Sequence, residues 1–277
     1  AQVSAERINE VLDRKASIVE GSVQSGNEVG TVEFKNVSFR YPHATENELT
    51  DIDFKVNKGE TLAIIGATGS GKSTLIGLIP RFYDATSGEV LVDGVNVKDY
   101  TFDALYDKLG YVTQKAVLFS GTIKDNVLFG ESAADSDEAR LEEAIELSQA
   151  KEFVDRLPEG TEHEIAQLGR NVSGGQKQRL SIARALARKP EILIFDDSFS
   201  ALDYKTDAKL REGLNEQLKD TTKIIVAQRI STIRHADKII VLDRGEAVGM
   251  GTHEELMRSC EVYREIATSQ LSASELA

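Results

Sequence analysis

Short apolar runs alternate with amphipathic segments along most of the chain. Consecutive apolar residues predict strands buried on both faces, and apolar residues at helical spacing predict helices with one buried side. The predicted strands are 31–41, 52–56, 62–65, 191–195, 223–227 and 238–242. The predicted helices are 102–109, 122–128, 136–149, 151–157, 176–188 and 206–218, with further helices near the C-terminus. This alternation indicates an α/β protein with a parallel sheet and helices on its faces.

Four segments depart from the simple alternation. Residues 1–20 have the pattern of an amphipathic helix, and residues 21–30 that of a linker containing Gly, Ser and Asn. Residues 89–97 resemble a hairpin around an Asp-Gly pair. The block 115–172 shows no strong strand, so we predict a helical insertion there, with Ser136 as the candidate N-cap of one of its helices.

A phosphate-binding loop follows the apolar run 62–65. The sequence GATGSGKST fits the pattern G-x-x-x-x-G-K-[ST] at every fixed position, and helix formers follow it. Glycines let the backbone curl so that successive N–H groups point at one anion, and the helix N-terminus adds partial positive charge. Lys72 would supply a point charge to the terminal phosphates, and the Ser73 hydroxyl would reach a magnesium ion. The expected phosphate-binding residues are Gly66, Thr68, Gly69, Ser70, Gly71, Lys72, Ser73 and Thr74.

Two aspartates end the most apolar strand. Residues 192–195 (ILIF) deliver Asp196 and Asp197 to the carboxyl edge of the predicted sheet, where ligands bind in open α/β sheets. Asp196 would fix the magnesium ion through water. Asp197 stands where an ATPase of this design places a carboxylate to orient the attacking water. The pair therefore predicts the second half of a nucleotide site.

Five separate segments together resemble the nucleotide-binding domain of an ABC transporter of the exporter type. They are 66–74, Gln114 after YVT, VSGGQ at 172–176, ILIFDD at 192–197, and SALD at 200–203. Their order and spacing match the family, and the resemblance covers roughly residues 30–270. The segment VSGGQKQRLSIARAL is the most specific of them, since few other ATPases carry Ser-Gly-Gly-Gln before a helix.

The resemblance implies an architecture. Residues 30–270 would form a phosphate-loop (RecA-like) parallel-sheet core with an N-terminal antiparallel β subdomain and a helical subdomain at about 115–175. Residues 1–29 would be the linker from a membrane domain, and 271–277 a C-terminal tail. The chain would then be a piece of a longer polypeptide at the cytoplasmic face of a membrane, with ATP and Mg²⁺ as its cofactors.

The resemblance also assigns roles beyond the phosphate loop. Tyr41 matches the aromatic residue that stacks on the adenine, and Gln114 the residue that bridges magnesium to the membrane-domain interface. In the family two such domains stack head to tail, and each ATP lies between one chain's phosphate loop and the other chain's signature loop. The signature loop acting in trans would be Ser173, Gly174, Gly175 and Gln176. The loop at the dimer contact would be Ser200, Ala201, Leu202 and Asp203.

Three positions depart from the family pattern, and two of them fall on the nucleotide site. Asp197 stands where the family usually has glutamate, and its side chain is shorter by about 1.5 Å. Gln228 stands where the family usually has histidine, and it cannot carry a positive charge. Gln167 replaces a glutamate common in exporters, whereas the signature loop is intact apart from Val172 in place of leucine.

These departures resemble the degenerate-site half of a heterodimeric exporter. The partner would be a second, non-identical nucleotide-binding domain that carries the glutamate and histidine missing here. One alternative is an active homodimeric exporter domain in which Asp197 and Gln228 are tolerated. The functional class of the chain also has two alternatives. The chain could be an ATPase subunit in its own right, or a module that occludes nucleotide with negligible turnover.

The composition of the chain excludes several kinds of binding partner. The 277 residues carry 33 basic and 46 acidic side chains, a net charge of −13 that argues against a nucleic-acid surface and a polybasic lipid-binding patch. No apolar run approaches the ~20 residues that span a bilayer, and the lone Cys260 excludes an internal disulfide framework. A DNA-repair or translation relative is disfavoured by the acidic charge, and a phosphate-loop kinase leaves Ser-Gly-Gly-Gln unexplained. Nothing in the sequence indicates which substrate would be transported.

Overall fold

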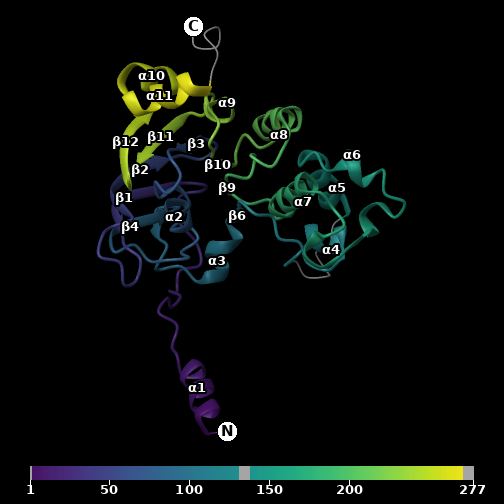
Figure 1. The fold of residues 1–277 in the computed structure, drawn as a ribbon, viewed down its shortest axis with the longest axis horizontal. Helices are drawn as coiled ribbons and strands as arrows, with labels where there is room; N and C mark the ends of the chain where they lie inside the picture. Colours follow the sequence, from purple (N-terminus) through teal and green to yellow (C-terminus); the bar gives the residue numbers. More distant parts are fainter. Residues whose placement is uncertain (1, 131–137, 271–277) are drawn as a thin grey trace.

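A six-stranded sheet forms the centre of the protein. The computed structural model describes residues 2–130 and 138–270 (Figure 1). The strand order is β12-β11-β3-β10-β9-β6, parallel throughout except for the antiparallel edge strand β12. The bounds are β3 Thr61–Ile65, β6 Leu109–Val112, β9 Ile192–Asp196, β10 Thr222–Val226, β11 Lys238–Asp243 and β12 Glu246–Gly251. The inner strands are buried at nearly every position and mostly apolar, because helices or a second sheet cover both faces.

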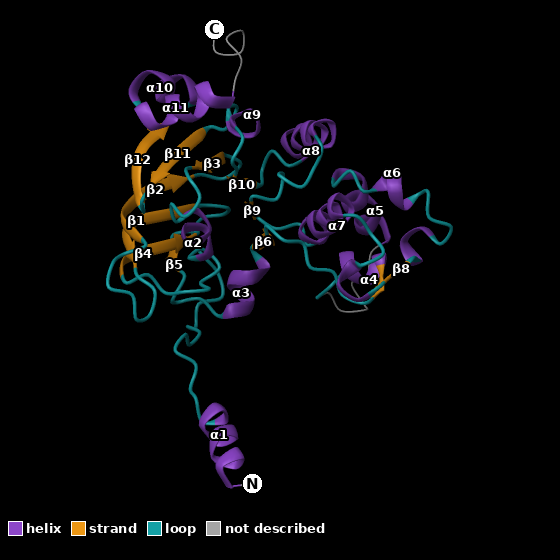
Figure 2. Cartoon of the chain, viewed as in Figure 1, coloured by secondary structure: helices purple, strands orange, loops and turns teal. Residues whose placement is uncertain are grey.

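A second, antiparallel sheet packs beside the first. Its order is β2-β1-β4-β5, and Figure 2 shows its strands next to the central sheet. The bounds are β1 Val32–Phe39, β2 Leu49–Val56, β4 Ser87–Val92 and β5 Val95–Asn96. The predicted hairpin lies between β4 and β5, where Asp93 and Gly94 both have positive φ (51° and 75°), as a tight hairpin turn requires.

The two faces of the central sheet contact different hydrophobic clusters. Leu62 and Ile64 of β3 pack with the antiparallel sheet and with α2 (Lys72–Gly77). Ala63 and Ile65 point the opposite way and pack with the helical side of the molecule. This alternation along one short strand gives each layer of the molecule its own hydrophobic cluster, with the central sheet between them.

A helical lobe lies to one side of the sheets (Figure 1). Its helices are α4 Ile123–Val127, α5 Glu138–Leu147, α6 Lys151–Val154 and α7 Gly174–Ala187. The lobe also contains a two-residue strand pair that sequence analysis did not predict, β7 (Gly121–Thr122) with β8 (Glu164–Ile165). Ser136, the candidate N-cap, lies outside the described residues. The predicted helical insertion is therefore present, with a minimal β-ladder inside it.

The remaining helices cover the central sheet or flank it. They are α3 Phe102–Asp107, α8 Tyr204–Gln217, α9 Ile230–Ile233, α10 His253–Ser259 and α11 Glu261–Gln270, and short 3₁₀ turns occur at Gly160–Glu162 and Gln167–Gly169. The strand β12 is not predicted from its sequence, because its residues are mostly exposed and include two glycines that weaken the strand signal. The predicted helix at 102–109 also extends into residue Leu109, which begins β6.

The N-terminal helix stands apart from the body. The helix α1 (Gln2–Leu12) ends well before residue 20, and Figures 1 and 2 show it separated from the sheets by an extended segment. Its apolar residues Ile8, Val11 and Leu12 are exposed. Within the described ranges, no helix is long and apolar enough to cross a lipid bilayer.

The extended segment from residue 19 to 31 is attached to the body at several points. The Arg81 guanidinium donates to the Val19 carbonyl at 2.9 Å, and Val23 forms a bridge with Tyr100. Thr222, which is completely buried, donates its hydroxyl to the carbonyl of Gly30. The predicted linker therefore lies against the body and is bonded to it.

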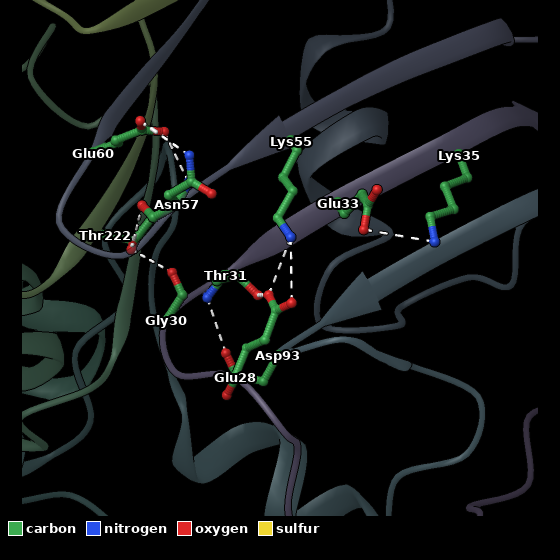
Figure 3. Close-up of polar contacts among 10 residues, drawn as sticks. All are labelled: Glu28, Gly30, Thr31, Glu33, Lys35, Lys55, Asn57, Glu60, Asp93 and Thr222. Atoms are coloured by element: carbon green, nitrogen blue, oxygen red, sulfur yellow. Dashed lines mark hydrogen bonds and ion pairs between the residues drawn. The ribbon is translucent and has the colours of Figure 1, made fainter.

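Figure 3 shows the Thr222–Gly30 contact together with further bonds made by Glu28 and Thr31 at the end of this segment. The Glu28 carboxylate accepts from the Thr31 hydroxyl at 2.7 Å and from Lys55 Nζ at 3.2 Å. The Thr31 N–H donates to Asp93 Oδ1 at 2.9 Å. These bonds fix the start of β1 against the hairpin between β4 and β5.

Candidate functional site

The phosphate-binding loop joins the end of β3 to the start of α2. Gly69 and Gly71 have φ of 79° and 95°, the left-handed region that favours glycine. At Gly66, an added Cβ would lie 2.0 Å from the carbonyl oxygen of Leu242, so the close approach of β11 excludes any side chain there. The fixed glycines of the motif are therefore required by the backbone and by packing.

Lys72 holds the curl of its own loop. Its Nζ donates to the carbonyls of Gly66 (2.8 Å) and Ala67 (2.7 Å). Burial lowers the pKa of Lys72 below its ordinary value, and the nearby carboxylates Asp197 and Asp196 oppose that shift. The ammonium is thus placed at the centre of the loop with two carboxylates close by.

Ser73 and Asp196 form an oxygen pair beside the loop. The Ser73 hydroxyl donates to Asp196 Oδ1 at 2.8 Å, joining the start of α2 to the end of β9. Burial raises the pKa of Asp196, the Ser73 hydrogen bond lowers it, and the adjacent Asp197 raises it further. Among the described residues, no cluster of His, Cys, Asp and Glu could hold a metal by itself. One carboxylate with a hydroxyl fits Mg²⁺, which usually binds proteins through one or two carboxylates together with phosphates and water.

Asp197 is held by two glutamine side chains. Its Oδ2 accepts from Gln228 Nε2 at 2.7 Å and from Gln114 Nε2 at 3.2 Å. Asp197 is only 6% exposed, and its φ is 46°, a left-handed value that is uncommon outside glycine. Its backbone N–H donates to the carbonyl of Val226 at 3.0 Å. The ends of β6, β9 and β10 therefore bring three of the predicted site residues into one hydrogen-bonded group.

A cavity of about 200 Å³ unites these residues. Its lining comprises Glu48, Thr68, Gly69, Gly71, Lys72, Ser73, Thr74, Gln114, Asp196, Asp197, Val226 and Gln228. Glu48 was not singled out from the sequence, because it precedes β2 in a segment without a recognisable motif. The other polar members are all residues that the motifs identify.

Tyr41 lies beside the cavity. Its hydroxyl is 2.8 Å from the Thr74 hydroxyl, and its ring contacts Phe39 and Tyr83 edge-on. The base-stacking residue expected from sequence is thus bonded to the helix that follows the phosphate loop.

The signature loop does not reach this cavity. Ser173 caps α7, and a reciprocal capping box with Gln176 satisfies both backbone N–H groups. Ser173 and Gly174 are exposed, and an added Cβ at Gly174 would have no neighbour within 4 Å. Within one chain, then, residues 173–176 and the phosphate loop belong to different surfaces.

Residues 200–203 have local structural roles. Ser200 Oγ donates to the carbonyl of Asp197 at 2.8 Å, and Leu202 is buried in the core. Asp203 caps α8 by accepting from the Thr206 N–H at 3.0 Å and the Thr206 hydroxyl at 2.6 Å. Asp203 and Ala201 are exposed. The loop therefore connects Asp197 directly to the start of α8.

Fold and loop together define a phosphate-loop α/β protein with the ABC ATPase fold, as the sequence analysis predicted. Residues 49–200 match the sequence profile of the family described as "ABC transporter". The chain belongs to this family.

Several known proteins are similar to this chain. An uncharacterized ABC transporter ATP-binding protein of Bacillus subtilis, YfiB, is 45% identical over 270 residues, which cover 98% of this chain and 46% of YfiB. A putative multidrug export ATP-binding/permease protein of the same organism, YgaD, is 46% identical over 241 residues, covering 87% of this chain and 41% of YgaD. The solved structure of a bacterial Atm1-family ABC exporter with ATP bound superposes with a TM-score of 0.91 at 34% identity, covering 98% of this chain and 48% of that one. The chain thus spans about half the length of the relatives it matches.

Proposed function

We propose that this chain is the ATP-binding domain of an ABC exporter and binds Mg-ATP in the cavity at the end of β3. The observation that carries the proposal is the joint geometry of Lys72 within the loop and the Ser73–Asp196 oxygen pair beside it. The names of the relatives, an export ATP-binding/permease protein and an ABC exporter with ATP bound, support the same activity. Bound nucleotide would supply the phosphoryl group for transfer to water, with Mg²⁺ neutralising its charge.

The residues have separate tasks in this proposal. The backbone N–H groups of 66–74 and the ammonium of Lys72 hold the phosphates, and Tyr41 stacks on the base. Ser73 and Asp196 would hold Mg²⁺. Gln114 donates its Nε2 to Asp197, which leaves its Oε1 as the atom that would reach the metal.

We further propose that the site binds ATP but hydrolyses it weakly. A carboxylate that orients water needs an oxygen directed at that water; Asp197 Oδ2 already accepts from two amides, so Oδ1 is the oxygen that remains for this task. The aspartate also reaches about 1.5 Å less far than a glutamate, and a misplacement of about 1 Å can lower such a rate on the order of a hundredfold. Gln228 adds no positive charge to the site.

A second nucleotide-binding domain would complete the assembly. The signature loop 173–176 lies outside the cavity of its own chain, so its exposed cap would serve a facing domain. We propose a non-identical partner with the glutamate and histidine that this chain lacks, and a fused membrane domain that places both at the cytoplasmic face of a membrane. Residues 1–29 would be the connection to that domain, 30–270 the nucleotide-binding domain, and 271–277 its tail. An active homodimer is the alternative.

Phosphate release under saturating Mg-ATP tests the proposal. We compare the native chain with a double variant, Asp197→Glu with Gln228→His. A triple variant that adds Lys72→Ala to these two changes is the control, since it is expected not to bind ATP. If the native chain is nearly inert and the double variant hydrolyses ATP, the result supports a degenerate site. Brisk hydrolysis by the native chain would make Asp197 a competent carboxylate and favour the homodimer.

A further inference from the structure

Three aromatic rings form a cluster beside the nucleotide cavity. The ring centroid of Tyr41 lies 4.8 Å from that of Phe39 and 5.2 Å from that of Tyr83. In both pairs the ring planes are nearly perpendicular, with interplanar angles of 81° and 86°. The Phe39 and Tyr83 centroids are 5.4 Å apart, so each ring contacts the other two. Phe39 is buried in the core, whereas Tyr83 is 41% exposed. Edge-to-face pairs of this kind are favoured because the edge and the face of an aromatic ring carry opposite partial charges.

Tyr83 lies on a loop that is fixed at both ends. On one side, Arg81 is 6% exposed and donates to Asp84 Oδ1 at 2.7 Å and to the Val19 carbonyl at 2.9 Å. On the other side, the Thr86 N–H donates to the Ser38 carbonyl at 2.9 Å. The Tyr83 ring therefore rests on a backbone held in place from both directions.

Tyr41, by contrast, is only half-buried, and the side chains around it hold its ring. The hydroxyl is bonded to Thr74 at the start of α2, Phe39 covers the core side, and Tyr83 supplies the remaining aromatic wall. Removing the Tyr83 ring would leave Tyr41 with one aromatic neighbour and a single hydrogen bond. The Tyr41 ring could then rotate out of the plane in which a base stacks on it.

We propose that Tyr83 is a positioning residue for base recognition, which acts by holding the plane of the Tyr41 ring. The inference rests on the proposed ATP site, because it concerns the base end of that ligand. Tyr83 does not line the phosphate cavity, so it acts through the ring of Tyr41 at the base end of the site. Stacking reads the face of the ring and tolerates base identity, so ATP and GTP gain equally from Tyr83.

The size of the effect follows from one edge-to-face pair. If the stabilisation of one such aromatic pair is lost from the bound state, the affinity for a nucleotide that stacks on Tyr41 falls by roughly two- to tenfold. Inorganic triphosphate has no base, so its affinity stays the same. The ratio of ATP affinity to triphosphate affinity is therefore the quantity that separates a positioning role from general damage to the fold.

Calorimetric titration of the 277-residue chain with Mg-ATP, Mg-GTP and Mg-triphosphate measures this ratio. The variants are Tyr83→Ala and Tyr83→Leu, which remove the ring, and Tyr83→Phe, which keeps it. Tyr106→Ala is the matched control, since Tyr106 is 39% exposed and stacks on Phe102 away from the cavity. Thermal unfolding of each variant confirms that it is folded.

We expect Tyr83→Ala and Tyr83→Leu to weaken ATP and GTP alike and to leave triphosphate unchanged, with Tyr83→Phe and Tyr106→Ala close to the native chain. Unchanged ATP affinity in both ring-deleting variants overturns the inference. Equal weakening of ATP and triphosphate also overturns it, because the role of Tyr83 would then be structural. A native chain that binds neither ligand refutes the ATP site itself, and the inference falls with it.

Discussion

Lys108 stabilises a buried acidic cluster, and its removal should strongly destabilise the fold. Its Nζ lies 2.7 Å from Asp93 Oδ2 and 3.0 Å from Glu191 Oε2. The Asp93 side chain is completely buried, and the Glu191 side chain is 35% exposed. Burial raises the pKa of Glu191, and its hydrogen bond with Asp93 raises it further, while Lys108 opposes both. Without Lys108, the completely buried Asp93 carboxyl would face the partly exposed Glu191 carboxyl with no lysine between them.

The magnitude follows from the burial of Asp93. Removing one partner of a buried ion pair costs about 3–5 kcal/mol, because it leaves an uncompensated buried charge. We therefore expect Lys108→Met, which keeps most of the aliphatic stem, to lower the free energy of unfolding by about 3–5 kcal/mol at pH 7. Urea unfolding followed by circular dichroism measures this difference.

Lys58→Met is the matched control for this experiment. Lys58 lies 3.4 Å from Asp220 Oδ1, and these side chains are 48% and 92% exposed. An exposed pair of this kind contributes about 0–1 kcal/mol. If Lys108→Met costs no more than Lys58→Met, the buried cluster is not held by the lysine and the reasoning is refuted.

Two further predictions concern buried hydroxyl groups. Thr222→Val removes the donor to the Gly30 carbonyl and the acceptor of the Gly59 N–H, so urea unfolding should show a loss of about 1–3 kcal/mol; a change below 0.5 kcal/mol, the level of an ordinary surface substitution, would contradict the role given to this contact. Burial raises the pKa of Tyr100 to about 12, so between pH 10 and 12 the folded state binds more protons than the unfolded state and stability falls as the pH rises. In unfolding curves measured across that interval, Tyr100→Phe should show a shallower fall than the native chain, and equal slopes would contradict the assignment.

The shape of the loop at residues 66–71 could be predicted from sequence because its glycines are fixed by geometry. Gly66 has no space for a Cβ, and Gly71 needs a left-handed backbone, so the motif records constraints that only certain residues satisfy. The strands of the central sheet were predictable for a similar reason, since burial on both faces demands apolar runs. The fold class followed from their alternation with helices.

Contacts between strand ends could not be predicted in the same way. Gln114, Asp197 and Gln228 meet because β6, β9 and β10 are neighbours in the sheet, and strand order is not written in any one segment. The family resemblance implies a role for Gln114 at magnesium, whereas its bond to Asp197 depends on the strand order. The contact of Tyr83 with Tyr41 was missed because it joins loops distant in the sequence and belongs to no motif.

The attachment of residues 19–31 to the body has a mechanical consequence. A free tether goes slack and transmits tension only once it is taut, whereas this segment is bonded from Val19 onward. A pull on α1 would first load the bond between Val19 and Arg81, and Arg81 follows α2, the helix that begins at Lys72. Force applied at the N-terminal end would therefore be shared between the chain that follows α2 and residues Asp99 and Tyr100, whose carbonyls accept from the N–H groups of residues 21–23.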